Sequence, residues 1–207
     1  MIKRTNPING CGPVPVRANS DSRGCLFEIY REEWPGAFKT VQWNACASRK
    51  GVMRGVHVHV DYDEFYTLPT GRVFIALRDI RRSSSTFGAS VGFEWSSAHG
   101  IAVPVPAGVA HAVYFLEDSV LAFGLSGYWR AELDVVGCRW DKLDPSLTWP
   151  IETAALSARD QESGDFDGMV AKFEALSASL GEAASAKPPT KKSAKTTAKT
   201  TGRMAQT

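Results

Sequence analysis

The sequence lacks any apolar run close to the roughly 20 residues of a membrane-spanning helix. Its first residues, MIKRTNPINGCGPVP, also lack the apolar core of a secretory signal. We therefore expect a cytoplasmic chain with no membrane contact. The cysteines form no CxxC pair, so we expect reduced thiols rather than zinc ligands at four positions: Cys11, Cys25, Cys46 and Cys138.

Acidic residues are absent from the C-terminal end, where the segment from Lys187 to Thr207 holds five lysines and one arginine. This segment has no aromatic residue and no structured motif, so a solvated tail is favoured over a nucleic-acid-binding arm. The composition predicts one folded domain over residues 1–182 and a disordered basic tail over residues 183–207. No specific nucleic acid partner is expected.

Helical periodicity is missing from about Val14 to Pro150, where short runs rich in Val, Phe, Ile, Tyr and Trp alternate with Gly, Pro, Ser and Asp. This pattern is typical of an all-β sandwich or barrel. The period changes near the C-terminus, where Asp167 to Leu180 places Met169, Phe173, Leu176 and Leu180 on one helical face. We expect one or two short C-terminal helices on the barrel, with Gly181 as a C-cap.

Histidine is scarce, with only four in the chain, and three of them fall into two patterns. Gly51 to Gly71 reads G-x5-H-x-H-x4-E-x6-G and contains His57, His59 and Glu64. Gly100 to His111 reads G-x5-P-x-G-x2-H. The two patterns resemble the sequence motifs of the cupin superfamily, which implies a jelly-roll-like barrel, or double-stranded β-helix.

The cupin resemblance also implies a candidate metal site. In metal-binding cupins the matching residues form a site of three histidines and one carboxylate, which here are His57, His59, Glu64 and His111. Such a donor set suits a divalent Fe, Mn, Ni, Zn or Cu ion and leaves coordination positions open for a substrate.

At a finer level the chain resembles the dTDP-4-dehydrorhamnose 3,5-epimerase family, the sugar-nucleotide cupins of rhamnose biosynthesis. The resemblance is collinear from Asp21 to Asp160. It rests on the segments DSRGCLFE (21–28), VQWN (41–44), KGVMRGVH (50–57), DIRRSSSTFG (79–88), PAGVAHAV (106–113), GCRWDKLDPSLTWP (137–150) and LSARD (156–160).

This resemblance implies that His57, supported by Asp160, is the base that removes a proton beside the C4 ketone of the sugar. Such an epimerase requires no cofactor. The resemblance also implies a homodimer that shares residues across its interface. It implies substrate-binding roles for Arg23 and Arg54 on the diphosphate, for Glu28, Gln42 and Asn44 near the base and sugar, and for His111.

Several positions depart from the family pattern. The lysine that stabilises the enolate aligns with Glu64, and a glutamine two residues after the base is His59. The tyrosine that acts as acid aligns with Gly124, or with Phe123 after a one-residue shift, and Tyr128 lies four residues away. A core aspartate of the family is replaced by Ile75.

Three hypotheses follow from these features. The first is an epimerase or isomerase of a dTDP-4-keto-6-deoxyhexose with an altered active site. The second is a metal-dependent cupin, an oxygenase or isomerase acting on a small molecule. The third is a non-catalytic member that binds a sugar nucleotide. The replacement of lysine by Glu64 and of glutamine by His59 completes the metal quartet, the four candidate ligands named above. His57 would then be needed both as the base of the epimerase and as a ligand of the metal.

Overall fold

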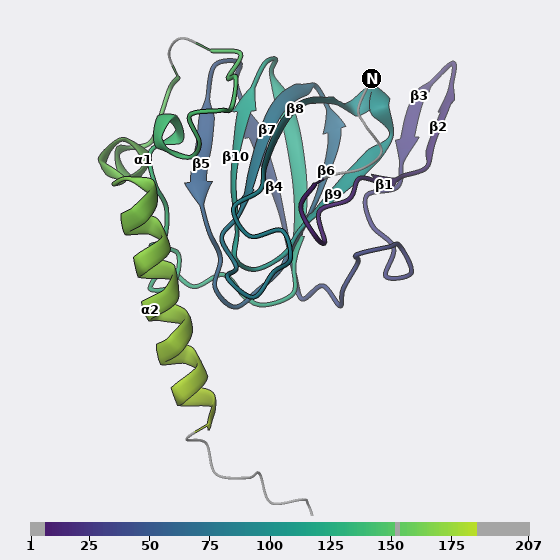
Figure 1. The fold of residues 1–207 in the computed structure, drawn as a ribbon. Helices are drawn as coiled ribbons and strands as arrows, with labels where there is room; N and C mark the ends of the chain where they lie inside the picture. Colours follow the sequence, from purple (N-terminus) through teal and green to yellow (C-terminus); the bar gives the residue numbers. More distant parts are fainter. Residues whose placement is uncertain (1–6, 152–153, 186–207) are drawn as a thin grey trace, which may run out of the picture.

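The computed structural model describes residues 7–151 and 154–185, and within them nearly all regular structure up to residue 125 is β-strand. Figure 1 shows two antiparallel sheets that face each other, with helices at one side. The predicted all-β cupin barrel is therefore confirmed.

The larger sheet has the strand order β1-β9-β6-β11-β4 and the smaller sheet the order β5-β10-β7-β8. The larger sheet consists of β1 (Val14–Pro15), β9 (Ile101–Val105), β6 (Glu64–Thr70), β11 (Ser119–Leu125) and β4 (Gln42–Ser48). The smaller sheet consists of β5 (Met53–His57), β10 (Val109–Phe115), β7 (Arg72–Asp79) and β8 (Ser90–Ser96).

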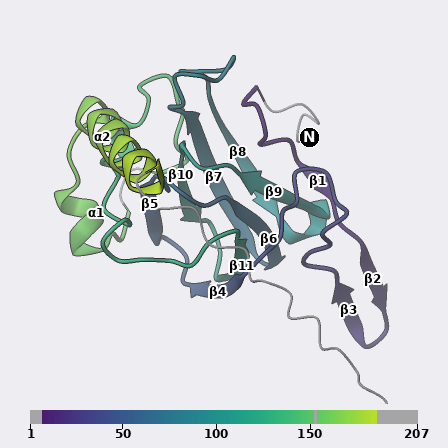
Figure 2. The same cartoon turned by 90° about the horizontal axis from the view of Figure 1, so that it is seen from below.

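The remaining elements lie outside the two sheets. A hairpin of β2 (Ala18–Asp21) and β3 (Gly24–Phe27) projects from the barrel beside β1 (Figures 1 and 2). Two short 3-10 helices, η1 (Ser97–His99) and η2 (Trp140–Lys142), lie in connections. The chain ends with α1 (Ala158–Glu162) and α2 (Phe166–Ser185).

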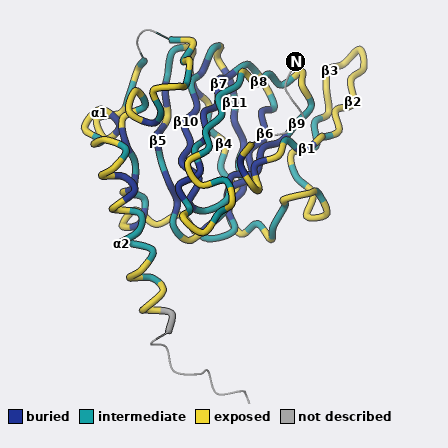
Figure 3. The backbone as a smooth tube through the Cα atoms, in the orientation of Figure 1, coloured by how far each residue is buried: buried dark blue, intermediate teal, exposed yellow. Residues whose placement is uncertain are grey.

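Strand β7 shows why the two faces of the smaller sheet are both apolar. Val73, Ile75 and Leu77 point between the sheets into the main core, whereas Phe74 and Ala76 belong to a second core on the outer face. Side chains alternate between faces along a strand, so this near-continuous apolar run fits a strand covered on both sides. Figure 3 shows the buried residues concentrated in these central strands. Ile75 is fully buried in the main core.

Helix α2 covers the outer face of the smaller sheet. Met169 and Val170 are buried there, with Phe173 and Leu176 packed against the same cluster. The apolar face predicted from the sequence therefore exists, but the helix continues through Gly181, so the prediction of Gly181 as a C-cap is wrong. The helix ends at Ser185, three residues beyond residue 182, and the expected disorder of residues 186–207 lies outside the described residues.

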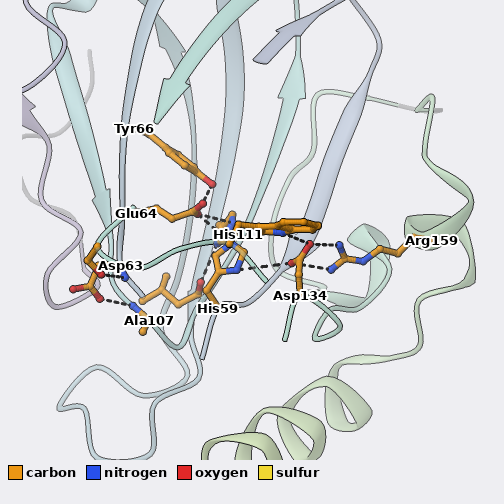
Figure 4. A network of polar contacts seen from close by, with 11 residues as sticks. His59, Asp63, Glu64, Tyr66, Ala107, His111, Asp134 and Arg159 are labelled. Carbon is orange, nitrogen blue, oxygen red and sulfur yellow. Dashed lines mark hydrogen bonds and ion pairs between the residues drawn. The ribbon is translucent and has the colours of Figure 1, made fainter. Parts of the chain in front are cut away.

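Gly71 forms the turn between β6 and β7, as the first cupin pattern requires. Its φ is +93°, and a Cβ there would lie 2.1 Å from the Oγ of Ser119. A residue with a side chain would be strained in this conformation and would also clash. The turn connects β6 in the larger sheet to β7 in the smaller sheet. Glu64 lies at the opposite end of β6, beside His59 and His111 (Figure 4).

Candidate active site

A cavity of about 740 Å³ opens inside the barrel, between the two sheets and the segment that precedes α1. Most residues predicted for the site line it. Those eight residues are Gln42, Asn44, Arg54, His57, His59, Glu64, His111 and Asp160. Two predicted residues, Arg23 and Glu28, do not.

His57 and Asp160 contact each other at the cavity wall. His57 is the last residue of β5, and its Nε2 lies 2.8 Å from Oδ1 of Asp160. Asp160 lies in the first turn of α1, where its backbone N–H donates to the Oγ of the N-cap Ser157. Burial opposes ionisation of Asp160, but the hydrogen bond with His57 lowers the pKa of the carboxyl below its ordinary value. An ionised Asp160 accepts a hydrogen bond from the N–H at Nε2, which leaves Nδ1 as the basic nitrogen of a neutral imidazole.

His59, Glu64 and His111 form a second group, which we call the His59–Glu64–His111 cluster (Figure 4). Oε2 of Glu64 lies 3.3 Å from Nε2 of His59 and 3.2 Å from Nε2 of His111. The hydroxyl of Tyr66 donates to the same oxygen at 2.6 Å. All four side chains are buried.

The charges in this cluster are coupled. Burial opposes the charge on Glu64, yet the neighbouring His59 and His111 lower its pKa to about 2. Burial lowers the pKa of His111 to about 4. For His59 burial also opposes the charge, but the carboxylates of Glu64 and Asp134 raise its pKa above the ordinary value. These shifts favour the charged form of Glu64 and of His59 and the neutral form of His111.

The predicted metal quartet is divided between these two groups. Within the described residues, the side chains whose ligand atoms lie within 4.8 Å of one another are His59, Glu64 and His111, without His57. The sequence places His57 and His59 on one face of a strand, but β5 ends at His57 and His59 lies beyond it. Both histidines still line the cavity.

Several residues of the site were not predicted from the sequence. Tyr62 stacks on His59 with ring centroids 4.4 Å apart, and Tyr66 bonds Glu64. Asp134 faces Nδ1 of His59 at 3.9 Å and is held by Arg159 at 2.7 Å. Tyr66 could have been found, because it lies two residues after Glu64 on a strand and so shares its face. Asp134 and Arg159 lie in irregular or short segments with no such signal.

Arg23 and Glu28 lie outside this cavity, on and beside the β2–β3 hairpin. Arg23 is in the turn of the β2–β3 hairpin, is 88% exposed and pairs with Asp21. Glu28 follows β3, pairs with Arg31 and lines a separate shallow pocket. Within one chain, therefore, the hairpin does not bring these two residues to the barrel interior.

The two residues that the sequence offers for the position of the family tyrosine, Phe123 and Gly124, lie on opposite faces of β11. Phe123 lines the cavity and packs edge-to-face on Tyr66, with ring centroids 5.4 Å apart. A Cβ on Gly124 would instead meet Thr40 and Trp43 on the opposite face of β11. Tyr128 is 69% exposed and is not among the residues that line the cavity. The one-residue shift that brings Phe123 into the tyrosine position therefore agrees with the direction of the side chains.

Comparison with known proteins agrees with this architecture. The family model described as dTDP-4-dehydrorhamnose 3,5-epimerase matches residues 5–167. The chain is 29% identical over 171 residues to a dTDP-4-dehydrorhamnose 3,5-epimerase of Sinorhizobium fredii, covering 78% of this chain and 87% of that protein.

Solved structures give the same relationship. An epimerase of Legionella pneumophila in complex with dTDP-4-keto-L-rhamnose has a TM-score of 0.73 and 26% identity, covering 82% of this chain and 94% of that one. The 4-keto-6-deoxy sugar epimerase NovW of Streptomyces spheroides has a TM-score of 0.71 and 26% identity, covering 84% and 89%. The resemblance seen in the sequence motifs is confirmed, and the chain belongs to the dTDP-4-dehydrorhamnose 3,5-epimerase family, whose members are carbohydrate epimerases.

Proposed function

We propose that this chain epimerises a dTDP-4-keto-6-deoxyhexose at a carbon beside the C4 ketone, with His57 as the base and Asp160 as the residue that positions it. The observation that carries the proposal is the 2.8 Å contact between Nε2 of His57 and Oδ1 of Asp160 at the wall of the cavity. A base held in one tautomer by a buried carboxylate is what proton abstraction from carbon requires.

The proton transfer can be written with these atoms. Nδ1 of His57 takes the proton from C3 or C5, the C–H electron pair forms a C=C bond to C4, and the ketone electrons move to the C4 oxygen. Asp160 stabilises the imidazolium formed at His57. His57 releases its proton to solvent, and a proton from solvent added to the other face of the same carbon completes the epimerisation. In this form the reaction requires no cofactor.

The enolate needs positive charge or a hydrogen-bond donor near the C4 oxygen, where Glu64 replaces the lysine of the family. An isolated carboxylate would repel the enolate. Glu64, however, is held between His59 and His111. The pKa of His59 is raised, which favours a positive charge on His59 that offsets the negative charge of Glu64. We propose that these two histidines offset the repulsion between Glu64 and the enolate.

Loss of the family tyrosine should restrict the reaction. Phe123 carries no proton, so the second face of the sugar has no donor from β11. The cavity-lining hydroxyls on the described residues include those of Tyr62 and Tyr66, both beside the His59–Glu64–His111 cluster. We propose that the chain acts at one of the two carbons rather than at both.

Binding of the nucleotide is assigned to further side chains that line the cavity. Arg54 is held by Ser48, with Nε 3.0 Å from the hydroxyl oxygen, and can bind the diphosphate. Gln42 and Asn44 bond each other at 3.1 Å and are placed for the base or sugar.

Arg23 and Glu28 can take part only if a second copy of the chain brings them to the cavity. We propose a homodimer in which the β2–β3 hairpin reaches the partner. Exposed apolar residues support such a contact, since Leu26 on the hairpin is 71% exposed and Trp43 on β4 is 40% exposed.

A cytoplasmic reaction in rhamnose biosynthesis belongs to the same proposal. The cysteines of the structure form no disulfide, which fits a reducing compartment. Among the described residues, no helix has both the length and the apolar character needed to cross a membrane.

Solvent deuterium exchange tests the proposed function. The protein is incubated in D2O with a dTDP-4-keto-6-deoxyhexose, and proton NMR follows the signals of C3 and C5. Loss of one of these signals, faster than in buffer, is expected. Binding of dTDP with no exchange at high protein concentration would contradict the proposal and support the non-catalytic member.

One observation favours a second candidate, a metal-dependent cupin oxygenase or isomerase that acts on a small molecule. The cluster of His59, Glu64 and His111 has the donors that divalent Fe, Mn, Ni, Zn or Cu ions use in such enzymes. Exchange at C3 or C5 that is unaffected by removal of metal would favour the first candidate.

A further inference from the structure

We propose that His59, Glu64 and His111 bind one divalent transition-metal ion, while His57 remains the partner of Asp160. The proposal concerns a site that goes beyond epimerisation by side chains alone. The sequence patterns assign His57 both as a metal ligand and as the catalytic base. The structure separates these roles, because His59, Glu64 and His111 lie together whereas His57 contacts Asp160.

The distances between the donor atoms fit a metal ion. Oε2 of Glu64 lies 3.3 Å from Nε2 of His59 and 3.2 Å from Nε2 of His111. Bonds of about 2.1 Å to a shared ion, at tetrahedral or octahedral angles, place neighbouring donors roughly 3.0 to 3.4 Å apart. The set of two imidazoles and one carboxylate is also one that borderline divalent metals prefer.

The tautomer of His111 supports a cation at this point. Nδ1 of His111 lies 3.1 Å from the carbonyl oxygen of Val109, which can only accept, so Nδ1 carries the proton. Nε2 of the neutral ring then directs a lone pair at the carboxylate of Glu64. A metal ion between Nε2 and the carboxylate would remove the repulsion between this lone pair and the negative oxygen of Glu64.

Neighbouring side chains hold two of the donors in place. Tyr66 donates to Oε2 of Glu64, and Asp134 faces Nδ1 of His59, which favours a proton on Nδ1 and leaves Nε2 for the ion (Figure 4). Asp134 is itself fixed by Arg159. Partners of this kind orient metal ligands in proteins.

The remaining coordination positions would face the cavity, because all three ligands line it. If the proposed function holds, a bound cation there would supply the electrophilic stabilisation of the C4 oxygen that the family lysine provides.

His57 is not part of this site. Its ring centroid is 6.4 Å from that of His111, compared with 5.1 Å between His59 and His111. Its Nε2 is also occupied by Asp160. Substitution of His57 should therefore leave metal binding intact, whereas a quartet that includes His57 would not.

Metal titration of the full chain, prepared without a histidine tag and stripped with a chelator, tests the proposal. Calorimetry with Zn²⁺ and visible absorption with Co²⁺ are expected to show one ion per chain. His59→Gln, Glu64→Gln and His111→Gln should each weaken Kd by at least about 100-fold, and Tyr66→Phe by about 10-fold. His57→Gln, and His99→Gln at an exposed turn, should stay within about threefold of wild type, too small a change for a lost ligand.

Two results would overturn the proposal. One is the absence of a stoichiometric site with Kd below about 1 mM for either ion, which would mean a protonated His59–Glu64 pair instead. The other is a loss in His57→Gln as large as in His59→Gln. Circular dichroism checks that each variant is folded. If a ligand variant is unfolded, the Co²⁺ spectrum of the wild-type protein tests whether the metal site exists. Deuterium exchange is measured separately, before and after metal is restored to the chelator-treated protein, and absence of exchange in both states would contradict the epimerase function but not the metal site.

Discussion

Nε2 of His57 lies 2.8 Å from Oδ1 of Asp160, although 103 residues separate them in the chain. The contact depends on how the segment before α1 docks on β5. The backbone N–H of Met53 donates to the carbonyl of Ala155 at 2.9 Å, and Val52 pairs with Ala155 in a parallel bridge. The C-terminal segment therefore acts as an extension of the smaller sheet, and it carries Asp160 to the end of the strand that holds the base.

Restoring a hydroxyl on β11 should restore a proton donor. Phe123→Tyr adds a phenol to a side chain that already lines the cavity. A positioned general acid contributes about 10² to 10⁴ in rate, so we expect epimerisation at least about 10-fold faster, or deuterium at a second carbon. Phe123→Leu is the matched control, which should show no gain. An equal rate in Phe123→Tyr and wild type would contradict the assigned position.

Arg54 should contribute to nucleotide binding from within the same chain. Arg54→Ala removes the cavity-lining guanidinium that Ser48 positions, and we expect dTDP to bind about 10- to 100-fold more weakly by calorimetry, the range for loss of a charge-assisted contact. Arg139→Ala, which changes an exposed arginine that pairs with Asp141 and lines neither pocket, is the control. Unchanged affinity in Arg54→Ala would remove this residue from the substrate site.

Asp79, at the end of β7, should be important for stability. Its buried carboxylate accepts from Arg81 at 2.8 Å and from the hydroxyls of Ser84 and Thr86 at 2.7 Å. Burial opposes ionisation, but these hydrogen bonds lower the pKa well below its ordinary value. Asp79→Asn should cost about 3 kcal/mol at pH 7, measured by urea unfolding, because it removes the charge of a buried pair.

The pH dependence of that effect follows from the direction of the shift. A carboxyl with a lowered pKa in the folded state stabilises the protein above the unfolded pKa of about 4, and the contribution is lost as pH falls further. The difference in unfolding free energy between wild type and Asp79→Asn should therefore narrow below about pH 4. A difference that is constant from pH 7 to pH 3 would exclude a role for the Asp79 charge.

The thiols should differ in reactivity. Burial raises the pKa of Cys11 and of Cys138 to about 12, whereas Cys25 is exposed on the hairpin. Because the thiolate is the reactive form, iodoacetamide at pH 8 should modify Cys25 first and should modify Cys11 and Cys138 only after unfolding. Mass spectrometry of timed samples identifies the order. Early modification of Cys138 in the folded protein would contradict the packing of the second core.

The fold could be predicted from the sequence because its signals are local. Alternating apolar runs, turn glycines such as Gly71 and the two histidine patterns each depend on neighbouring residues. The end of α2 was misplaced for a related reason, since Gly181 is a poor helix residue that the chain tolerates on an exposed surface.

The sequence could predict which residues line the candidate site better than it could predict which of them contact each other. The motifs identified His57, His59, Glu64 and His111, but spacing does not show that β5 ends at His57 and that Asp160 occupies its Nε2. The partners Asp134 and Tyr62 come from loops, whose positions depend on packing across the whole barrel.

The most direct test of the account is deuterium exchange with the His57–Asp160 pair altered. In D2O with a dTDP-4-keto-6-deoxyhexose, we expect wild-type protein to exchange the proton at C3 or C5. Exchange should fall at least about 10³-fold in His57→Asn and about 10² to 10⁴-fold in Asp160→Asn, while dTDP binding is retained. Exchange in His57→Asn at the wild-type rate would contradict the assignment of His57 as the base.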